Sequence, residues 1–268
     1  MAGNYVYPGG TVDKSDESPE ILTRVASGAG KGSHAGVAAP ANLPGYRVAA
    51  IRELFEEAGI LLAYDTDGAL FRIKNESEQE RFSEHRNKLN ARKLTMVELL
   101  AEEHLLLAFD QLHYYTHWIT PEANPVRFDT RFFVARNPSG QVATPDLKET
   151  TEGTWIAPRS ALEANVRGDV PLSPPTLKTL EDIGRFDTLD SLLRSLDGAE
   201  GKPPVQPVSV VLGGETVLIY PWDPDYELYR STDPDRYPKE ITHGRPSTPS
   251  DNTTRLVYRQ GLWLPFVK

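Results

Sequence analysis

The chain of 268 residues contains no cysteine, which excludes disulfides, thiol nucleophiles and thiolate metal sites. It has no apolar run near the ~18 residues that a membrane-spanning helix needs. Its first thirty residues contain no apolar core of a signal peptide. We therefore expect a cytoplasmic location without a membrane partner, and the C-terminal Phe266-Val267-Lys268 is not a peroxisomal address.

Positive charge is also scarce, because 29 Lys and Arg stand against 38 Asp and Glu, for a net charge of −9. A nucleic-acid groove needs a basic stripe, so we expect no nucleic-acid partner. A phosphorylated small molecule is still compatible with this charge, because a bound metal ion reverses the local sign. The length suits one large domain or one domain with an extension, and leaves the oligomeric state open, a homodimer included.

The most informative segment is Arg52-Glu53-Leu54-Phe55-Glu56-Glu57-Ala58-Gly59-Ile60. Helical spacing places Glu53, Glu56 and Glu57 on one face, opposite an apolar stripe that a core would bury. Gly59 suits the left-handed position that closes a helix. Three carboxylates this close repel one another unless a cation holds them, and oxygen ligands suit Mg²⁺ or Mn²⁺. The alternative is an ordinary surface helix with solvated charges.

This segment resembles the second half of the Nudix box, G-x5-E-x7-R-E-U-x-E-E-x-G-U, in which U is apolar. Tyr7-Pro8-Gly9-Gly10 supplies the opening glycine, and Asp16 stands at the position of the first glutamate. The family spaces this acid seven residues before the arginine, whereas 35 residues, 17–51, intervene here. Many of the additional residues are Gly, Ala, Ser and Pro, which is the composition of a mobile loop. We therefore predict that 17–42 is an inserted loop outside the core.

A narrower resemblance is to the Nudix branch that contains the peroxisomal acyl-CoA diphosphatases and many bacterial relatives. It rests on four runs, Tyr5-Val6-Tyr7-Pro8-Gly9-Gly10-Thr11-Val12-Asp13, Arg47-Val48-Ala49-Ala50-Ile51, Trp118-Ile119-Thr120-Pro121-Glu122 and Arg127-Phe128-Asp129-Thr130-Arg131-Phe132-Phe133. This branch has a long insert inside the box and a helical insert after it. The resemblance does not determine the substrate.

The resemblance implies an α/β fold, namely the Nudix α/β/α sandwich with a mixed sheet. We expect a Nudix hydrolase domain over 1–200, a helical insert at 76–112, and a C-terminal β-rich extension over 201–268. Strands normally precede the Pro-Gly-Gly turn, so the N-terminal strands are either missing or replaced by others. Residue patterns predict helices at 44–59, 160–164, 174–183 and 188–196, and strands at 4–8, 60–64, 69–73, 126–136, 154–157, 208–212, 216–220, 255–258 and 262–266.

The resemblance also implies the roles of the box residues. Glu56 and Glu57 match the primary metal ligands, and the backbone carbonyl of Gly9 or Gly10 is a further candidate ligand. Glu53 matches the position that binds metal or acts as general base. Arg52 matches the residue that orients a glutamate, and Glu56 at i+4 is in its reach.

Nudix enzymes often add one acid from a distant loop, and this late glutamate commonly lies five or six residues before a tryptophan. Glu149 is therefore the preferred candidate, because it lies six residues before Trp155. Glu152 is the other candidate, and both residues can equally be solvated loop acids. Asp13 and Asp16 can help to close the site. The i, i+4 spacing of His113 and His117 is that of a zinc helix, but the glutamate of that motif is missing, so we interpret them as packing or hydrogen-bonding residues.

Cations outside the box can bind a substrate phosphate, and the candidates are Arg127, Arg131 and Lys148. Arg127 and Arg131 flank Asp129 at alternate positions of the predicted strand, so all three would share one face. An ion pair within the sheet is the preferred interpretation, because strand faces often carry such pairs.

The resemblance implies Mg²⁺- or Mn²⁺-dependent hydrolysis of the pyrophosphate in a nucleoside diphosphate linked to another group, with CoA or acyl-CoA as the leading substrate. The alternative is a Nudix-fold module that binds or senses a nucleotide without catalysis. Such modules usually lose acids of the R-E-x-x-E-E core, and this chain keeps them all. A second alternative is a catalytically idle domain that lacks the upstream strands.

Overall fold

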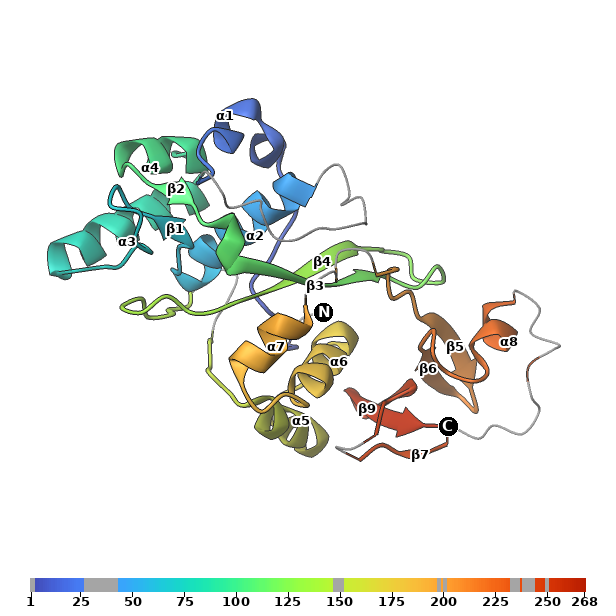
Figure 1. The fold of residues 1–268 in the computed structure, drawn as a ribbon. Helices are drawn as coiled ribbons and strands as arrows, with labels where there is room; N and C mark the ends of the chain where they lie inside the picture. Colours follow the sequence, from blue (N-terminus) through green and yellow to red (C-terminus); the bar gives the residue numbers. More distant parts are fainter. Residues whose placement is uncertain are drawn as a thin grey trace.

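The computed structural model describes residues 3–26, 43–146, 152–196, 199, 202–231, 237, 244–248 and 251–268. Two long antiparallel strands, β3 (Leu112–Ile119) and β4 (Asp129–Ala135), form the ribbon at the centre of the molecule. Helix α2 (Leu43–Ala58) lies above this ribbon in Figure 1, and α6 (Pro174–Ile183) and α7 (Leu189–Ser195) lie below it. The predicted α/β class is therefore confirmed.

Helix α2 forms where the sequence predicts it, with its apolar face in the main core. Val48 and Ile51 are fully buried and Phe55 is 2% exposed. The helix ends because Gly59 adopts φ +71° while its N–H donates to the carbonyl of Phe55 at 2.9 Å. An L-residue with a Cβ is disfavoured in that left-handed conformation, so glycine is the natural end of this helix.

The prediction that 17–42 is a loop outside the core is wrong for the described residues 17–26. The described part of the segment before α2 contains the 3₁₀ turn η1 (Lys14–Glu17) and the short helix α1 (Pro19–Leu22), with Ser18 Oγ accepting from the Ile21 N–H. Ile21 is only 1% exposed and packs against the α2 core. The average composition of the segment concealed this one stretch, in which a serine N-cap and a proline at the first helical position start a helix. Residues 27–42 lie outside the described part.

Residues 76–102 are largely helical as predicted, in α3 (Glu76–Asn90) and α4 (Met96–Glu102), but the last ten residues of the predicted helical segment are not. Residues 103–112 instead form β2 (Leu106–Leu107), the 3₁₀ turn η2 (Phe109–Gln111) and the start of β3. Leu107 is fully buried beside β1 (Ala63–Tyr64). A short apolar run such as Leu105-Leu106-Leu107-Ala108 cannot be assigned to a helix or a strand by periodicity alone.

Several predicted strands are shorter or absent. Of 60–64 only β1 is regular, and 69–73 contributes a single bridge between Leu70 and Tyr64. Residues 4–8 make only a parallel bridge from Tyr5 to Leu172, and 154–157 is not a strand. In that last segment Trp155 is 73% exposed, so its alternating pattern does not correspond to a buried face. The β4 prediction began three residues early, which leaves Arg127 outside the strand.

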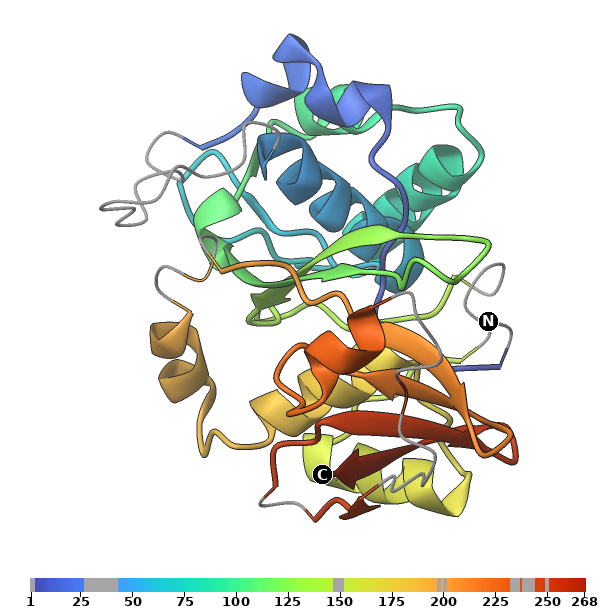
Figure 2. The same cartoon turned by 90° about the vertical axis from the view of Figure 1, so that its right-hand side faces the viewer.

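The C-terminal region is a five-stranded antiparallel sheet in the order β5-β6-β8-β9-β7, seen at the lower right of Figure 1 and face-on in Figure 2. Its elements are β5 (Val208–Leu212), β6 (Glu215–Ile219), α8 (Tyr226–Arg230), β7 (Arg245–Pro246), β8 (Arg255–Arg259) and β9 (Leu262–Val267). The predicted hairpin at Gly213-Gly214 is confirmed, with positive φ at both glycines.

This sheet shares a core with the residues that precede it. Trp118 of β3 and Leu177 of α6 form one buried cluster with Leu218, Tyr220 and Leu256. Helix α5 (Pro158–Arg167) packs beside α6 and contributes Ala161 to the same cluster. The β-rich extension is therefore packed against the lower helices of the sandwich.

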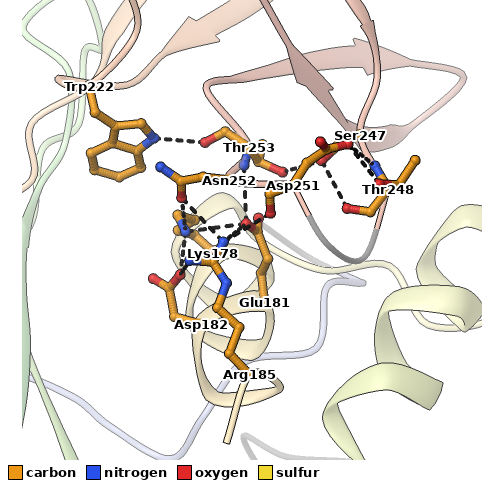
Figure 3. A network of polar contacts seen from close by, with 10 residues as sticks. All are labelled: Lys178, Glu181, Asp182, Arg185, Trp222, Ser247, Thr248, Asp251, Asn252 and Thr253. Carbon is orange, nitrogen blue, oxygen red and sulfur yellow. Dashed lines mark hydrogen bonds and ion pairs between the residues drawn. The ribbon is translucent and has the colours of Figure 1, made fainter. Parts of the chain in front are cut away.

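A buried polar network also joins α6 to the segment before β8 (Figure 3). Lys178, only 3% exposed, contacts Asp182 and Glu181 and donates to Asn252 Oδ1 at 3.0 Å. Glu181 Oε1 accepts from the backbone N–H of Thr253 at 3.1 Å. No helix in the described part of the chain is both long and apolar enough to cross a membrane.

Candidate metal and catalytic site

The last two turns of α2 bring the box acids together around one guanidinium. Arg52 Nη1 lies 2.8 Å from Glu53 Oε1 and 2.9 Å from Glu56 Oε2, so the predicted i, i+4 contact with Glu56 is confirmed. Each bond uses one oxygen of a carboxylate. Arg52 therefore fixes the orientation of two acids whose mutual repulsion would otherwise separate them.

Asp16, from the far side of the insert, completes this arrangement. Arg52 Nε and Nη2 donate to its two oxygens at 3.0 and 2.9 Å, and Nη2 also donates to the Thr11 carbonyl at 2.9 Å. Asp16 is 1% exposed, and its Oδ2 also accepts from the Asp13 N–H at 2.8 Å. Burial alone would lower the pKa of Arg52, but Asp16 and Glu53 raise it above its ordinary value, so the charge persists.

The Pro-Gly-Gly turn lies against the same helix face. The Gly9 N–H donates to Glu57 Oε2 at 3.4 Å. An ideal Cβ at Gly10 would lie 2.3 Å from Glu53 Oε1 and 2.6 Å from its Cδ, so the carboxylate occupies the space of a side chain. Only glycine at position 10 permits this approach. The two halves of the split box therefore meet in space across the inserted segment.

The electrostatics of this cluster favour a cation. Three carboxylates, those of Asp16, Glu53 and Glu56, contact the guanidinium of Arg52, and Glu57 lines the same cavity as Glu53 and Glu56. Burial raises the pKa of Glu56; Arg52 opposes this, while Glu53 and Asp16 add to it. A carboxylate with a raised pKa among other acids is the situation that a divalent ion relieves, and the donors are the hard oxygens that Mg²⁺ and Mn²⁺ prefer.

Among the described residues, no three Asp, Glu or His side chains already converge in the arrangement of a metal site. The contacts of Arg52 explain this, because they turn one oxygen each of Glu53 and Glu56 toward the guanidinium. The donor chemistry, the charge excess and the glycine cradle nevertheless fit a metal ion. The assignment of Glu53, Glu56, Glu57 and the Gly9 carbonyl as ligands stays a prediction.

A cavity of about 540 Å³ opens at these acids. Gly10, Glu53, Glu56 and Glu57 contribute to its wall, as the box predicts. The inserted helices contribute further lining residues that sequence reasoning missed: Asn90, Arg92, Leu94, Thr95 and Met96, together with Asp146 from the loop after β4. No motif marks them, because their part in the cavity depends on how α3 and α4 pack beside α2.

The end of α2 is held from outside by α3. Arg86 Nε and Asn90 Nδ2 donate to the Glu56 carbonyl at 2.8 and 3.3 Å, which satisfies a carbonyl that has no partner within the helix. Arg86 also donates to Thr144 through both terminal nitrogens. Burial lowers the pKa of Arg86, and the charges of Asp146 and Glu57 oppose that shift. Arg86 thus joins the helix that carries the acids to the loop that carries Asp146.

The remaining predicted residues lie elsewhere or outside the described part. Glu149 and Lys148 are outside it, and Glu152 Oε2 accepts from the Tyr5 hydroxyl at 3.2 Å. Arg127 Nε donates to the Thr120 carbonyl at 3.1 Å. The preferred ion pair is confirmed for Arg131, whose guanidinium contacts Asp129. Neither Arg127 nor Arg131 is among the residues that line the cavity.

The two histidines of the zinc-like spacing lie on a strand, which confirms that they form no zinc helix. His113 and His117 are both in β3, where residues four apart are separated by the length of two pleats. His117 Nε2 lies 2.7 Å from Asp129 Oδ1.

Fold and site together define a Nudix hydrolase, a pyrophosphohydrolase of the class that generally requires divalent metal ions. The family model of the NUDT19 Nudix domain matches residues 23–183, more than half of the chain. The chain therefore belongs to the NUDT19 Nudix family.

Curated relatives agree with this membership. The chain is 26% identical to the acyl-coenzyme A diphosphatase NUDT19 of Xenopus laevis over 264 residues, which is 84% of this chain and 69% of that protein. It is 28% identical to the protein of the same name from Gallus gallus over 272 residues, or 84% of this chain and 71% of that one. Among solved structures, a NUDIX hydrolase from Alicyclobacillus acidocaldarius matches with a TM-score of 0.54 at 24% identity, covering 75% of this chain and 83% of that chain. This likeness supports the fold alone.

Proposed function

We propose that this Nudix hydrolase cleaves the diphosphate of CoA or acyl-CoA with Mg²⁺ or Mn²⁺, giving adenosine 3′,5′-bisphosphate and (acyl-)phosphopantetheine. The observation that carries the hydrolase assignment is the meeting of Gly10, Glu53, Glu56 and Glu57 at one cavity of about 540 Å³. The CoA assignment is supported by the relatives, whose names describe acyl-coenzyme A diphosphatases. We also propose that the enzyme acts in the cytoplasm.

Within this proposal Glu56 and Glu57 hold the metal, with the Gly9 carbonyl and Glu149 as further ligands. When bound, the ion would neutralise the diphosphate oxygens and lower the pKa of a water molecule. Arg52 keeps Glu53 and Glu56 in place by the 2.8 and 2.9 Å bonds, so that little reorganisation is needed during the reaction. Glu53 either binds the ion or accepts the proton of the attacking water.

The alternative function is a Nudix-fold module that binds a nucleotide without cleaving it. The complete set of box acids and their common orientation around Arg52 favour the enzyme. A module that only binds a nucleotide does not require several carboxylates close together whose repulsion a buried arginine has to compensate.

The test is a product assay with CoA, acetyl-CoA, ADP-ribose, NADH and diadenosine polyphosphates, each with Mg²⁺, with Mn²⁺ and with EDTA. We expect CoA to yield adenosine 3′,5′-bisphosphate only when a divalent ion is present. Solvent ¹⁸O should enter one phosphate product, because water attacks phosphorus. Efficient cleavage of ADP-ribose with inert CoA would overturn the substrate proposal and leave the Nudix hydrolase. Absence of any cleavage by folded, metal-loaded protein would favour the sensor.

A further inference from the structure

We propose that Arg92, on the turn between α3 and α4, binds a substrate phosphate that lies outside the cleaved diphosphate. In a CoA substrate this is the 3′-phosphate. The inference rests on the proposed function for the identity of the substrate. Arg92 lies outside the Nudix box, so the region of the inserted helices would take part in substrate recognition.

The backbone conformation at Arg92 is one that usually has glycine. Helix α3 ends at Asn90, and Arg92 then adopts φ +55°. The Arg92 N–H donates to the Leu89 carbonyl and the Lys93 N–H to the Lys88 carbonyl, both at 2.8 Å. This pair of bonds is the Schellman motif, whose left-handed position is usually glycine. A large side chain here is disfavoured for the turn itself, and such strain is a feature of functional positions.

Arg92 is part of the wall of the site. It lines the same cavity as Glu53, Glu56 and Glu57. Of the described residues that line this cavity, Arg52 and Arg92 alone are Lys or Arg. Arg52 is buried and bonded to Asp16, Glu53 and Glu56, so it is committed to the acids. Arg92 is therefore the cavity cation that is available to a ligand.

The other arginines of the inserted helices already form hydrogen bonds within the protein. Arg81 donates to both oxygens of Glu103, at 2.8 and 3.0 Å. Arg86 is bonded to the Glu56 carbonyl and to Thr144. Arg92, in contrast, is exposed, and its guanidinium has no hydrogen bond or ion pair with the part of the chain that the structure describes.

Charge and geometry identify the ligand class. A planar guanidinium offers paired N–H donors that match the oxygens of a phosphate. The diphosphate itself would lie at the metal and the acids, which leaves Arg92 for a second anionic group. CoA carries such a group on its ribose, whereas dephospho-CoA does not. Arg127 and Arg131, two of the candidates that the sequence offered for this contact, lie outside the cavity wall and have other partners.

The experiment compares CoA with dephospho-CoA in the wild-type chain of 268 residues and in the variants Arg92→Gly, Arg92→Lys and Arg81→Ala. Arg92→Gly should lower kcat/KM for CoA about tenfold or more, which is the usual effect of losing one charged hydrogen bond. The loss should lie in KM, because the contact is remote from the reacting phosphorus. With dephospho-CoA the change should stay under about threefold, since the group concerned is absent.

The same variant separates binding from a structural role. Because glycine suits φ +55°, Arg92→Gly should not lower the melting temperature. Arg92→Lys should recover only part of the discrimination, since lysine keeps the charge but not the fork. The control Arg81→Ala, on the helix that precedes Arg92 but paired with Glu103, should leave the ratio of the two substrates unchanged.

Equal losses on both substrates, or no loss on either, would overturn the inference while hydrolysis stands. If the wild-type protein cleaves neither substrate, the proposed function fails and calorimetry decides the inference separately. Wild type should then bind adenosine 3′,5′-bisphosphate more tightly than AMP, and Arg92→Gly should remove that preference. Equal affinity of the wild type for the two nucleotides would overturn the role of Arg92.

Discussion

The carboxylate of Glu53 occupies the place that a side chain at Gly10 would need, since an ideal Cβ would lie 2.3 Å from Glu53 Oε1. This contact joins the two halves of a box that are separated by 35 residues of sequence. The same oxygen accepts from Arg52 at 2.8 Å. The position of Glu53 is therefore set jointly by a glycine before the insert and an arginine after it.

Gly10→Ala should reduce kcat roughly 10- to 100-fold, because a displacement of about 1 Å at a catalytic group has an effect of that size. Stability should change little, because Glu53 can move its carboxylate away from the new methyl group. Gly9→Ala is the matched control, because a Cβ there would have nothing within 4 Å. Steady-state kinetics and thermal unfolding of both variants test this, and equal effects at the two glycines would contradict it.

Glu56→Gln and Glu57→Gln should each lower kcat by at least about 100-fold, the usual effect of removing one key electrostatic group. The amide keeps the shape of the side chain but removes the charge that a divalent ion requires. Titration with Mn²⁺ should show weaker binding in both variants than in the wild type. Near-normal turnover in both variants would refute the assignment of these residues as ligands.

Glu56 should also make stability depend on pH in metal-free protein. Its folded pKa is raised above the ordinary 4.5, chiefly by burial, so folding disfavours its charged form. Its contribution is absent below about pH 4.5 and becomes unfavourable as pH rises through the folded pKa. With EDTA present, Glu56→Gln should therefore melt above the wild type at pH 7 and level with it at pH 4. A divalent ion should raise the melting temperature of the wild type more than that of the variant.

Ile21→Ala should destabilise the protein by about 2–4 kcal/mol, because it removes a side chain that is 1% exposed and packed against α2. The adjacent Leu22 is 41% exposed, so Leu22→Ala is the control and should have a much smaller effect. Denaturant unfolding measures both. Similar losses for the two variants would show that α1 contributes as a helix and not through Ile21.

Lys178→Met should destabilise the protein by about 3 kcal/mol, because Glu181 and Asp182 would lose the buried cation of the network in Figure 3 and keep only the exposed Arg185 as a partner. Lys88→Met is the control, because Lys88 forms an exposed i, i+4 pair with Glu84 at 2.8 Å. Surface pairs of this kind contribute little. Unchanged thermal unfolding of Lys178→Met would mean that the two acids find other compensation.

The sequence by itself was sufficient for the box helix and for the grouping of its acids on one face. Spacing placed Glu53, Glu56 and Glu57 on one face, and Gly59 marked the end of α2, because helix periodicity and glycine conformation are local properties. The same reasoning found α6 and the Gly213-Gly214 hairpin. The prediction from composition was wrong for 17–26, where Ile21 is buried in the core. It was also wrong for 103–112, where Leu106 and Leu107 pair with β1.

Only the tertiary structure decided how these parts combine. Asp16 reaches Arg52 across the insert, and the Glu56 carbonyl is held by Arg86 and Asn90 from α3. These are contacts between segments that no local pattern relates. The same packing brings Arg92 to the cavity wall, because the position of α3 and α4 beside α2 determines where the turn between them lies. Sequence thus specifies which chemistry the acids can perform, and packing specifies which other residues the substrate meets.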